Sequence, residues 1–344
     1  MHRICSRSAF AALVAFIFSS AGCARPESDG QNAAAERSVT DAASKPLTLA
    51  VIPKSIGSEF WETVEVGARE AAKELGVTIK WEGAAVETEL AEQNKIIENM
   101  VNLGVDGMAL APLNNRTMKK SVESVVAAGI PVVVFDSSVD GDAHISFVAT
   151  NNEAAGALAA EYLVERLKDE DKRVFMIRYI QGTASTEQRT EGFLKATEQG
   201  GLNVVASPYS EDATVAGSIK TASNTLERYV KDGKLEIDGV FAANLLSTMG
   251  LLTALQDLRQ SGVDVDVVFV GFDTSPSLIE ELQNGDIDAL VAQNPQRIGY
   301  LAVETLVKHL RGEKVEPVID TGVELVTRER LEKEPRIREL VGLE

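Results

Sequence analysis

From residue 47 onward, short apolar segments alternate with amphipathic segments, and this alternation constrains the fold more than any other feature of the chain. Residues 47–52 form an apolar run typical of a buried strand, and residues 59–75 carry apolar or small side chains at helical spacing. The same order continues to residue 135, with predicted strands at 77–81, 105–111 and 130–135 and predicted helices at 90–103 and 117–128. Strands separated by helices indicate parallel βαβ units, whose sheets are covered by helices on both faces.

The second half of the chain repeats this plan. Predicted helices fall at 154–167, 186–197, 215–229 and 246–258, and predicted strands at 174–179, 204–207, 237–242 and 267–270. The segment 105–111 resembles 237–243, and each leads through a helix to a strand that ends in Phe-Asp, at Asp136 and at Asp273. We therefore expect an α/β fold of two similar, doubly wound lobes. Ligands of such sheets bind outside the carboxyl ends of the strands, which is where both aspartates lie.

Composition excludes several classes of function. The chain has 344 residues, enough for about two domains, and a net charge of -18, which disfavours a nucleic-acid partner. Two Cys and three His are too few for a disulfide framework or a His-based metal site or triad. Phosphate-loop, dinucleotide-binding, nucleophile-elbow and zinc-protease motifs are absent. We expect no cofactor and no metal site, and Asp140, Asp142 and His144 lack the spacing of a calcium loop.

The N-terminal segment is typical of an export signal. Residues 1–22 carry basic side chains but no acid, and a short apolar run at 9–18 is followed by small residues up to Cys23. The end of this segment resembles a bacterial lipoprotein signal, which implies a lipid anchor on Cys23, although Ser20 stands where such signals usually have Leu. Ordinary secretion with an incidental Cys23 is the alternative. Residues 23–46 are polar or small and predict a flexible tether.

An ordered set of motifs resembles the periplasmic sugar-binding proteins of the ribose-receptor type, which serve ABC importers. The resemblance spans residues 47 to about 327. Bacterial repressor effector domains share the fold but begin with a DNA-binding helix-turn-helix, whereas this chain begins with a signal peptide. The motifs are Phe60-Trp61, Phe135-Asp136, Ser185 to Arg189 before Gly192-Phe193, Phe241-Ala242-Ala243-Asn244, Val270-Gly271-Phe272-Asp273, and Ala292-Gln293 before Ile298-Gly299.

The resemblance implies two lobes joined by a three-strand hinge, with a ligand cleft between them. The chain would cross between lobes near Thr150, near Gln293 and near Asp320. The apolar periodicity of the sequence does not by itself predict that the chain returns to lobe one. The implied boundaries are 47–150 plus 294–320 for lobe one and 151–293 plus 321–344 for lobe two.

The resemblance also implies a set of polar ligand contacts. A sugar offers hydroxyls that both donate and accept, so its receptor needs carboxylates, amides and charged donors. Asp136 and Asp273 match the carboxylates of the two lobes, Asn244 and Gln293 match the amides, and Arg189 matches a family arginine. Each has a structural alternative: an Asp that caps a turn, an Asn that forms one, or an Arg charge solvated on a helix.

Other positions concern the sugar face and the choice of ligand. Phe60 and Trp61 match an aromatic pair that sandwiches the sugar, and core packing of one of them is the alternative. Lys54 departs from the ribose pattern and resembles rhamnose and autoinducer-2 receptors, in which the lysine reaches the ligand; a solvated surface lysine is the alternative. Ser137 and Ala213 are further departures, which predict a remodelled cleft and disfavour D-ribose.

These observations favour a monomeric, exported receptor that delivers a sugar or polyol to an ABC permease in the inner membrane and performs no chemistry. A chemosensory ligand receptor is an alternative. A glycosidase that uses Asp136 and Asp273 as paired carboxylates is disfavoured, because they lie on different lobes. The predicted ligand-binding residues are Lys54, Phe60, Trp61, Asp136, Ser137, Arg189, Asn244, Asp273 and Gln293.

Overall fold

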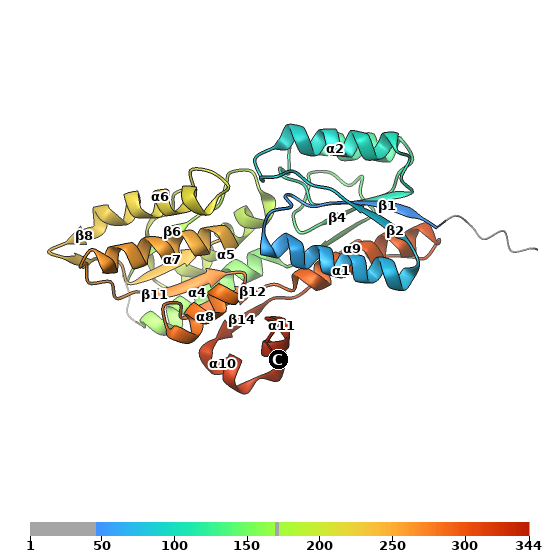
Figure 1. The fold of residues 1–344 in the computed structure, drawn as a ribbon. Helices are drawn as coiled ribbons and strands as arrows, with labels where there is room; N and C mark the ends of the chain where they lie inside the picture. Colours follow the sequence, from blue (N-terminus) through green and yellow to red (C-terminus); the bar gives the residue numbers. More distant parts are fainter. Residues whose placement is uncertain (1–45, 169–171, 344) are drawn as a thin grey trace, which may run out of the picture. The chain divides into compact units, whose positions relative to one another are not determined.

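The computed structural model describes residues 46–168 and 172–343. The predicted signal peptide, Cys23 and the predicted tether up to residue 45 lie outside the described residues. Within the described part, the chain forms two six-stranded sheets and a small two-stranded hairpin, and helices cover both faces of each large sheet (Figure 1).

Lobe one is built on a fully parallel sheet with the strand order β13-β5-β4-β3-β1-β2. Its strands are β1 (Thr48–Ile52), β2 (Thr78–Trp81), β3 (Gly107–Leu110), β4 (Val132–Phe135), β5 (Ser146–Ala149) and β13 (Val318–Asp320). Its helices are α1 (Glu59–Leu75), α2 (Leu90–Asn102), α3 (Lys119–Ala127) and α9 (Pro295–Leu310). Helix α2 lies on one side of this sheet, and α1 and α9 lie on the other (Figure 1).

Lobe two has the strand order β14-β12-β11-β10-β6-β7, with only β14 antiparallel to its neighbour. Its strands are β6 (Arg173–Ile177), β7 (Asn203–Ala206), β10 (Gly239–Ala242), β11 (Val268–Phe272), β12 (Ala289–Ala292) and β14 (Glu324–Thr327), with a hairpin of β8 (Val230–Lys231) and β9 (Lys234–Leu235). Its helices are α4 (Asn152–Leu167), α5 (Ala184–Gln199), α6 (Val215–Leu226), the 3₁₀ turn η1 (Glu227–Tyr229), α7 (Leu245–Gln260), α8 (Pro276–Asn284), α10 (Arg328–Lys333) and α11 (Pro335–Leu340).

The two sheets repeat one topology, because their first five strands follow the same spatial order, in lobe one β2-β1-β3-β4-β5 and in lobe two β7-β6-β10-β11-β12. The prediction of two similar doubly wound lobes is thus confirmed. Most strands and helices fall within a few residues of their predicted positions. Strand β5, the β8–β9 hairpin and the C-terminal elements from β13 onward had no counterpart among the predicted strands and helices.

Three connections join the lobes, and hydrogen bonds link the first of them to the third. The chain passes from β5 to α4, from β12 to α9 and from β13 to β14. The Thr150 hydroxyl lies 3.3 Å from that of Thr321, and the Asn151 amide donates to a carboxylate oxygen of Asp320 at 3.3 Å. We propose lobe boundaries beside these connections, at 150/151, 293/294 and 320/321.

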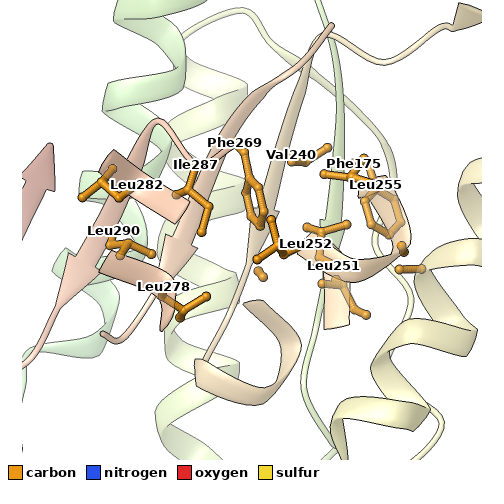
Figure 2. Packing of buried hydrophobic residues seen from close by; sticks show 14 of the residues in the cluster. Phe175, Val240, Leu251, Leu252, Leu255, Phe269, Leu278, Leu282, Ile287 and Leu290 are labelled. Carbon is orange, nitrogen blue, oxygen red and sulfur yellow. The ribbon is translucent and has the colours of Figure 1, made fainter. Parts of the chain in front are cut away.

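Each sheet has an apolar core on both faces. The largest cluster packs α6, α7 and α8 against the lobe two sheet, where leucines of the helices meet Phe175, Val240 and Phe269 of the strands (Figure 2). Burial of such side chains is the main term that holds each lobe together. The last turns of the chain, in α10 and α11, add Leu331 and Ile337 to the same cluster.

Glycines allow two helix pairs to approach at backbone distance. A Cβ atom at Gly156 of α4 would lie 1.9 Å from the carbonyl oxygen of Arg189 on α5, and one at Gly192 would lie 2.0 Å from that of Glu153. The same reciprocal arrangement joins α1 and α9 in lobe one, through Gly67 and Gly299. The crossing in lobe two therefore fixes the height of Arg189 above the sheet.

None of the described helices combines the length and the apolar character that a membrane span requires.

Candidate functional site

Strand ends from both lobes line a common pocket. Its wall is mostly polar and contains five ionisable carboxylate, ammonium and guanidinium groups. Eight of the nine predicted ligand-binding residues line it; Ser137 does not. The lining residues are Lys54, Ser58, Phe60, Trp61, Glu87, Asp136, Tyr179, Thr183, Ser185, Thr186, Arg189, Asn244, Leu245, Leu246, Asp273 and Gln293.

Asp136 and Asp273 occupy equivalent places in the two lobes. Each follows a central strand, and each has a left-handed backbone, with φ of 61° and 68°. The Asp136 amide donates to the Val148 carbonyl, and the Asp273 amide donates to the Val291 carbonyl, so both bonds reach the next strand of the sheet. Asp tolerates this conformation better than most residues, and strained backbone of this kind gathers at functional sites.

The Asp273 carboxylate is held from two sides. One oxygen accepts from the Gln293 side-chain amide at 2.8 Å, and the other accepts from the backbone N–H of Leu245 at 2.9 Å. Asp273 therefore caps the start of α7 rather than its own turn, while Ser275 caps α8 with Pro276 at its first position. With its nitrogen used by Asp273, Gln293 retains its side-chain oxygen as an acceptor.

Lys54 is buried at the end of β1 and is only 3 % exposed, which excludes a solvated surface lysine. Its ammonium lies 2.7 Å from Oδ2 of Asp136, which is 4 % exposed. It also donates to the hydroxyl of Ser185 in lobe two at 3.1 Å. Since an ammonium has three donors, one remains after these two partners.

Arg189 is fixed within lobe two and is 2 % exposed, so it is not the solvated charge that a helical arginine often is. Its Nε donates to Oδ1 of Asn152 at 2.8 Å, and its Nη1 donates to the carbonyl of Ala243 at 3.0 Å. The guanidinium lies over the ring of Phe272, 3.8 Å from its centroid. Nη2 makes no hydrogen bond to the described residues, which leaves one end of the rigid fork for a ligand.

Asn244 lines the pocket and also forms the turn that was its structural alternative. Its side-chain oxygen accepts from the backbone N–H of Ser247 at 3.1 Å, and its backbone N–H donates to the Ser247 hydroxyl. Together these two bonds make a capping box at the start of α7. This leaves the side-chain nitrogen of Asn244 as its group for a ligand.

The aromatic pair divides its roles between the core and the pocket. Trp61 is 2 % exposed and packs edge-on against both Phe60 and Phe135, at centroid distances of 5.0 and 6.3 Å. Only its polar edge is held at the pocket wall, where Nε1 donates to Glu87 at 2.8 Å. Phe60 is partly buried between the core clusters of the two lobes and provides the more accessible plane.

Ser137 lies behind the pocket wall, because its hydroxyl is used between the lobes. It is fully buried and accepts from the backbone N–H of Ser185 at 3.1 Å. Two neighbouring bonds also join the lobes, from Thr183 to the Leu113 carbonyl and from the Asn115 amide to the Gly182 carbonyl. We call residues 182–185 of lobe two, which are the turn before α5 and its first two residues, the clasp loop, since this segment contacts the ends of several lobe one strands.

Sequence reasoning missed several lining residues, above all Glu87 and Tyr179. Tyr179 follows β6 by two residues, so the strand-end rule that found Asp136 and Asp273 could have found it. Glu87 lies in the irregular segment between β2 and α2, where nothing in the sequence distinguishes it from the neighbouring Glu89.

The five charges of the pocket are three carboxylates and two cations. Burial raises the pKa of Glu87, and the Lys54 charge opposes this shift. Burial also raises the pKa of Asp273, opposed by Arg189 and by the hydrogen bond from Gln293. Burial lowers the pKa of the Arg189 guanidinium, and the neighbouring carboxylates counteract this. The pocket can thus offer charged acceptors and donors to a neutral, hydroxyl-rich ligand. The described residues contain no group of three His, Cys, Asp or Glu side chains suited to a metal ion.

Comparison with known proteins assigns the family. Residues 49–314 match the periplasmic binding protein domain. This chain is a member of that family. Among curated relatives, this chain is 28% identical to the ribose import binding protein of Bacillus subtilis, over 82% of this chain and 88% of that protein. It is 30% identical to the D-allose-binding periplasmic protein of Escherichia coli, over 78% and 86% respectively.

Solved structures agree with this assignment. A carbohydrate transporter solute-binding protein from Agrobacterium radiobacter, in complex with D-arabinose, has a TM-score of 0.80 and 31% identity, covering 87% of this chain and all (100%) of that one. A solute-binding protein from Agrobacterium vitis with bound D-fucose has a TM-score of 0.78 and 32% identity, covering 85% and 98%. The periplasmic binding protein is therefore a sugar-binding receptor of the ABC transporter type, which acts outside the cytoplasm and belongs with transport proteins rather than enzymes.

Proposed function

We propose that this receptor binds a neutral monosaccharide or a sugar-like polyol and delivers it to an ABC permease in the inner membrane by closing its two lobes. The observation that carries the proposal is the pocket lined by strand ends of both lobes, with Asp136 from one lobe and Asp273 and Arg189 from the other. A ligand bound there would contact both lobes and would favour the closed arrangement over an open one.

The ligand chemistry follows from the groups that remain free. Lys54, Arg189 and Asn244 each keep a donor, and Gln293 keeps an acceptor, while Phe60 offers an apolar plane. Hydroxyl groups pair with both kinds of partner, and the C–H face of a sugar ring packs on an aromatic plane. Lys54 and Asp136 already neutralise each other, so no net positive charge calls for an anionic ligand.

Relatives suggest which sugars to test. D-ribose, D-allose, D-arabinose and D-fucose are named with the related proteins, and they differ in the number of carbon atoms and in hydroxyl configuration. The rhamnose and autoinducer-2 alternative has no support among these proteins. We further propose that the receptor acts as a monomer, and that Cys23 carries the lipid anchor that keeps it at the membrane.

A thermal-shift screen followed by calorimetry tests the proposal. A sugar at 100 times its Kd should stabilise the protein by about 2.7 kcal/mol, which is a readily detected rise in Tm. Asp273→Ala serves as the matched control, since it should show a clearly smaller shift at the same sugar concentration. If pentoses, hexoses, deoxysugars and polyols all leave Tm unchanged and give no heat of binding, the proposed function is wrong.

A further inference from the structure

One polar group in the pocket wall lacks a well-formed hydrogen bond. The hydroxyl of Tyr179 is buried, the residue being 1 % exposed, and it makes no hydrogen bond of good geometry to any described residue. Burial raises its pKa, and so does the Glu87 carboxylate, which lies close beside it. Burying a hydroxyl without a partner costs free energy, so such a group calls for an explanation. Tyr179 belongs to lobe two and lines the pocket beside Glu87.

Glu87 approaches the same point from lobe one with one oxygen already used. Its Oε1 accepts from Trp61 Nε1, and no hydrogen bond to Oε2 is found among the described residues. The Trp61 bond holds the carboxylate in place, because the indole is itself fixed in the core by Phe60 and Phe135. We call Glu87 and Tyr179 the mixed corner, since it presents a carboxylate acceptor from one lobe beside a hydroxyl donor from the other.

We propose that the mixed corner is a subsite for one ligand hydroxyl, which donates to Glu87 Oε2 and accepts from the Tyr179 hydroxyl. This inference rests on the proposed function and deepens it, because it assigns Glu87 and Tyr179 as specificity-determining residues beyond the strand-end carboxylates, amides and arginine.

The chemistry of the corner selects against other groups. A carbonyl oxygen can accept from Tyr179 but cannot donate to Glu87, and an ammonium can donate to Glu87 but cannot accept from Tyr179. A hydrogen or methyl group leaves both unpaired in a buried place. Sites that hydrogen-bond a substrate hydroxyl discriminate strongly against analogues that lack it, for this reason. The subsite is also complete only when the lobes are closed, because its halves belong to different lobes.

The first experiment separates a ligand contact from a packing role. Tyr179→Phe removes only the hydroxyl, and Glu87→Gln keeps the shape of the side chain. Tyr229→Phe is the matched control, because its hydroxyl donates to the Val205 carbonyl in lobe two, outside the pocket. Tyr179→Phe should leave the Tm of the ligand-free protein unchanged or higher, since an unpaired buried hydroxyl is lost, while sugar affinity falls about tenfold to a hundredfold. A lower Tm with unchanged affinity would assign Tyr179 to packing alone.

The second experiment locates the hydroxyl. Calorimetry compares the tightest binder among D-ribose, D-allose, D-arabinose and D-fucose with its singly deoxygenated derivatives. One derivative should bind the wild type about tenfold to a hundredfold more weakly than the parent sugar. That difference should shrink at least severalfold in Tyr179→Phe and in Glu87→Gln and persist in Tyr229→Phe. A difference that persists in both corner variants, or the lack of any discriminated position, would overturn the subsite. If no pentose, hexose, deoxysugar or polyol binds the wild type, the proposed function fails, and the subsite fails with it.

Discussion

Asp136 and Asp273 look alike at the level of backbone and position, but the residues around them make their removal unequal. Asp273 is held by an amide and a backbone N–H, both neutral. Asp136 neutralises the buried ammonium of Lys54. Substitution of Asp136 therefore breaks a direct buried ion pair, whereas Asp273 makes no direct ion pair with a described residue and attracts the buried Arg189 guanidinium only from a longer distance.

We expect Asp273→Ala to weaken sugar binding by about 1.5–3 kcal/mol, the usual value of a hydrogen bond to a charged group, with little change in urea stability. Asp136→Ala should lose binding and also about 3–5 kcal/mol of stability, because breaking a buried pair strands the other charge. The double variant Lys54→Met/Asp136→Ala should regain much of this stability but not the binding. Equal urea midpoints for the two single variants would contradict this account.

Glu87 gives the protein a pH dependence with a predictable sign. Its pKa in the folded state lies above the ordinary value of 4.5, because burial disfavours the charged form of the carboxylate. The folded state therefore binds more protons than the unfolded state, and this contribution to stability is fully present below the ordinary value and is lost as pH rises through the folded-state pKa. Burial of Asp273 acts in the same direction.

The test is to measure the free energy of unfolding of wild type and Glu87→Gln from pH 7 down to just above 4.5. The advantage of the variant, which carries no buried charge, should be largest at pH 7 and should decline as pH falls. Glu92→Gln, an exposed helical site, should follow the wild type throughout. A difference between Glu87→Gln and wild type that does not change with pH would show that the carboxylate is not buried in its charged form.

At the scale of elements, helix boundaries were the easiest feature to predict. The hardest was the return of the chain to lobe one after it has built most of lobe two. Helix α1 matches its predicted range because Ser58 caps its start and Gly76, at φ of 66°, ends it. Those signals are local. By contrast, α9 and β13 complete lobe one although they lie more than 140 residues after β5 in the chain, and no local pattern encodes that return.

The site shows the same division between local and distant information. Strand ends and motif resemblance located Asp136, Arg189 and Asp273. The sequence could not show that Ser137 faces the clasp loop instead of the pocket, or that Glu87 meets Tyr179. Both facts depend on how the edge of one lobe faces the edge of the other, which is a property of the hinge and not of either segment.

The glycine crossing of α4 and α5 predicts a coupling between packing and binding. In Gly156→Ala the new methyl group would collide with the Arg189 carbonyl, so the helices must separate, at a cost of about 1–3 kcal/mol. Since Arg189 moves with its backbone, sugar affinity should fall as well. Gly67→Ala is the control, because it collides with Gln296, which lies outside the ligand pocket, and should lower stability by a similar amount with a smaller loss of affinity. Equal losses of affinity in both variants would contradict a specific coupling between the α4–α5 packing and sugar binding.

For the whole molecule, closure should be visible in tryptophan emission. Trp61 contacts Glu87 at the pocket, whereas Trp81 lies at the end of the edge strand β2 and does not line the pocket. Sugar titration should change the emission, and the change should vanish in Trp61→Phe but survive in Trp81→Phe. A signal that follows Trp81 would contradict the view that the pocket wall responds to the ligand.

Anchoring is a second property of the whole molecule. If Cys23 is lipidated, Cys23→Ser should move the protein from the membrane fraction to the soluble periplasm or leave its signal uncleaved. Cys5 lies within the predicted signal peptide, so Cys5→Ser should leave the fractionation unchanged. A wild-type protein that is found only in the soluble fraction would exclude the anchor.

Because the chain crosses between the lobes three times, the two lobes are completed in a fixed order during synthesis. Lobe two holds an uninterrupted set of segments from α4 to β12, with β14 added at its edge. Lobe one lacks α9 until residues beyond 293 are available, and α9 provides Ile298, Ala302, Val303 and Leu306 to the core that also contains α1. Until then, the apolar face of α1 and one face of the first sheet stay uncovered. The first lobe to emerge in the chain is therefore the last to be completed, and a chain cut short before α9 would expose the surface most prone to aggregate.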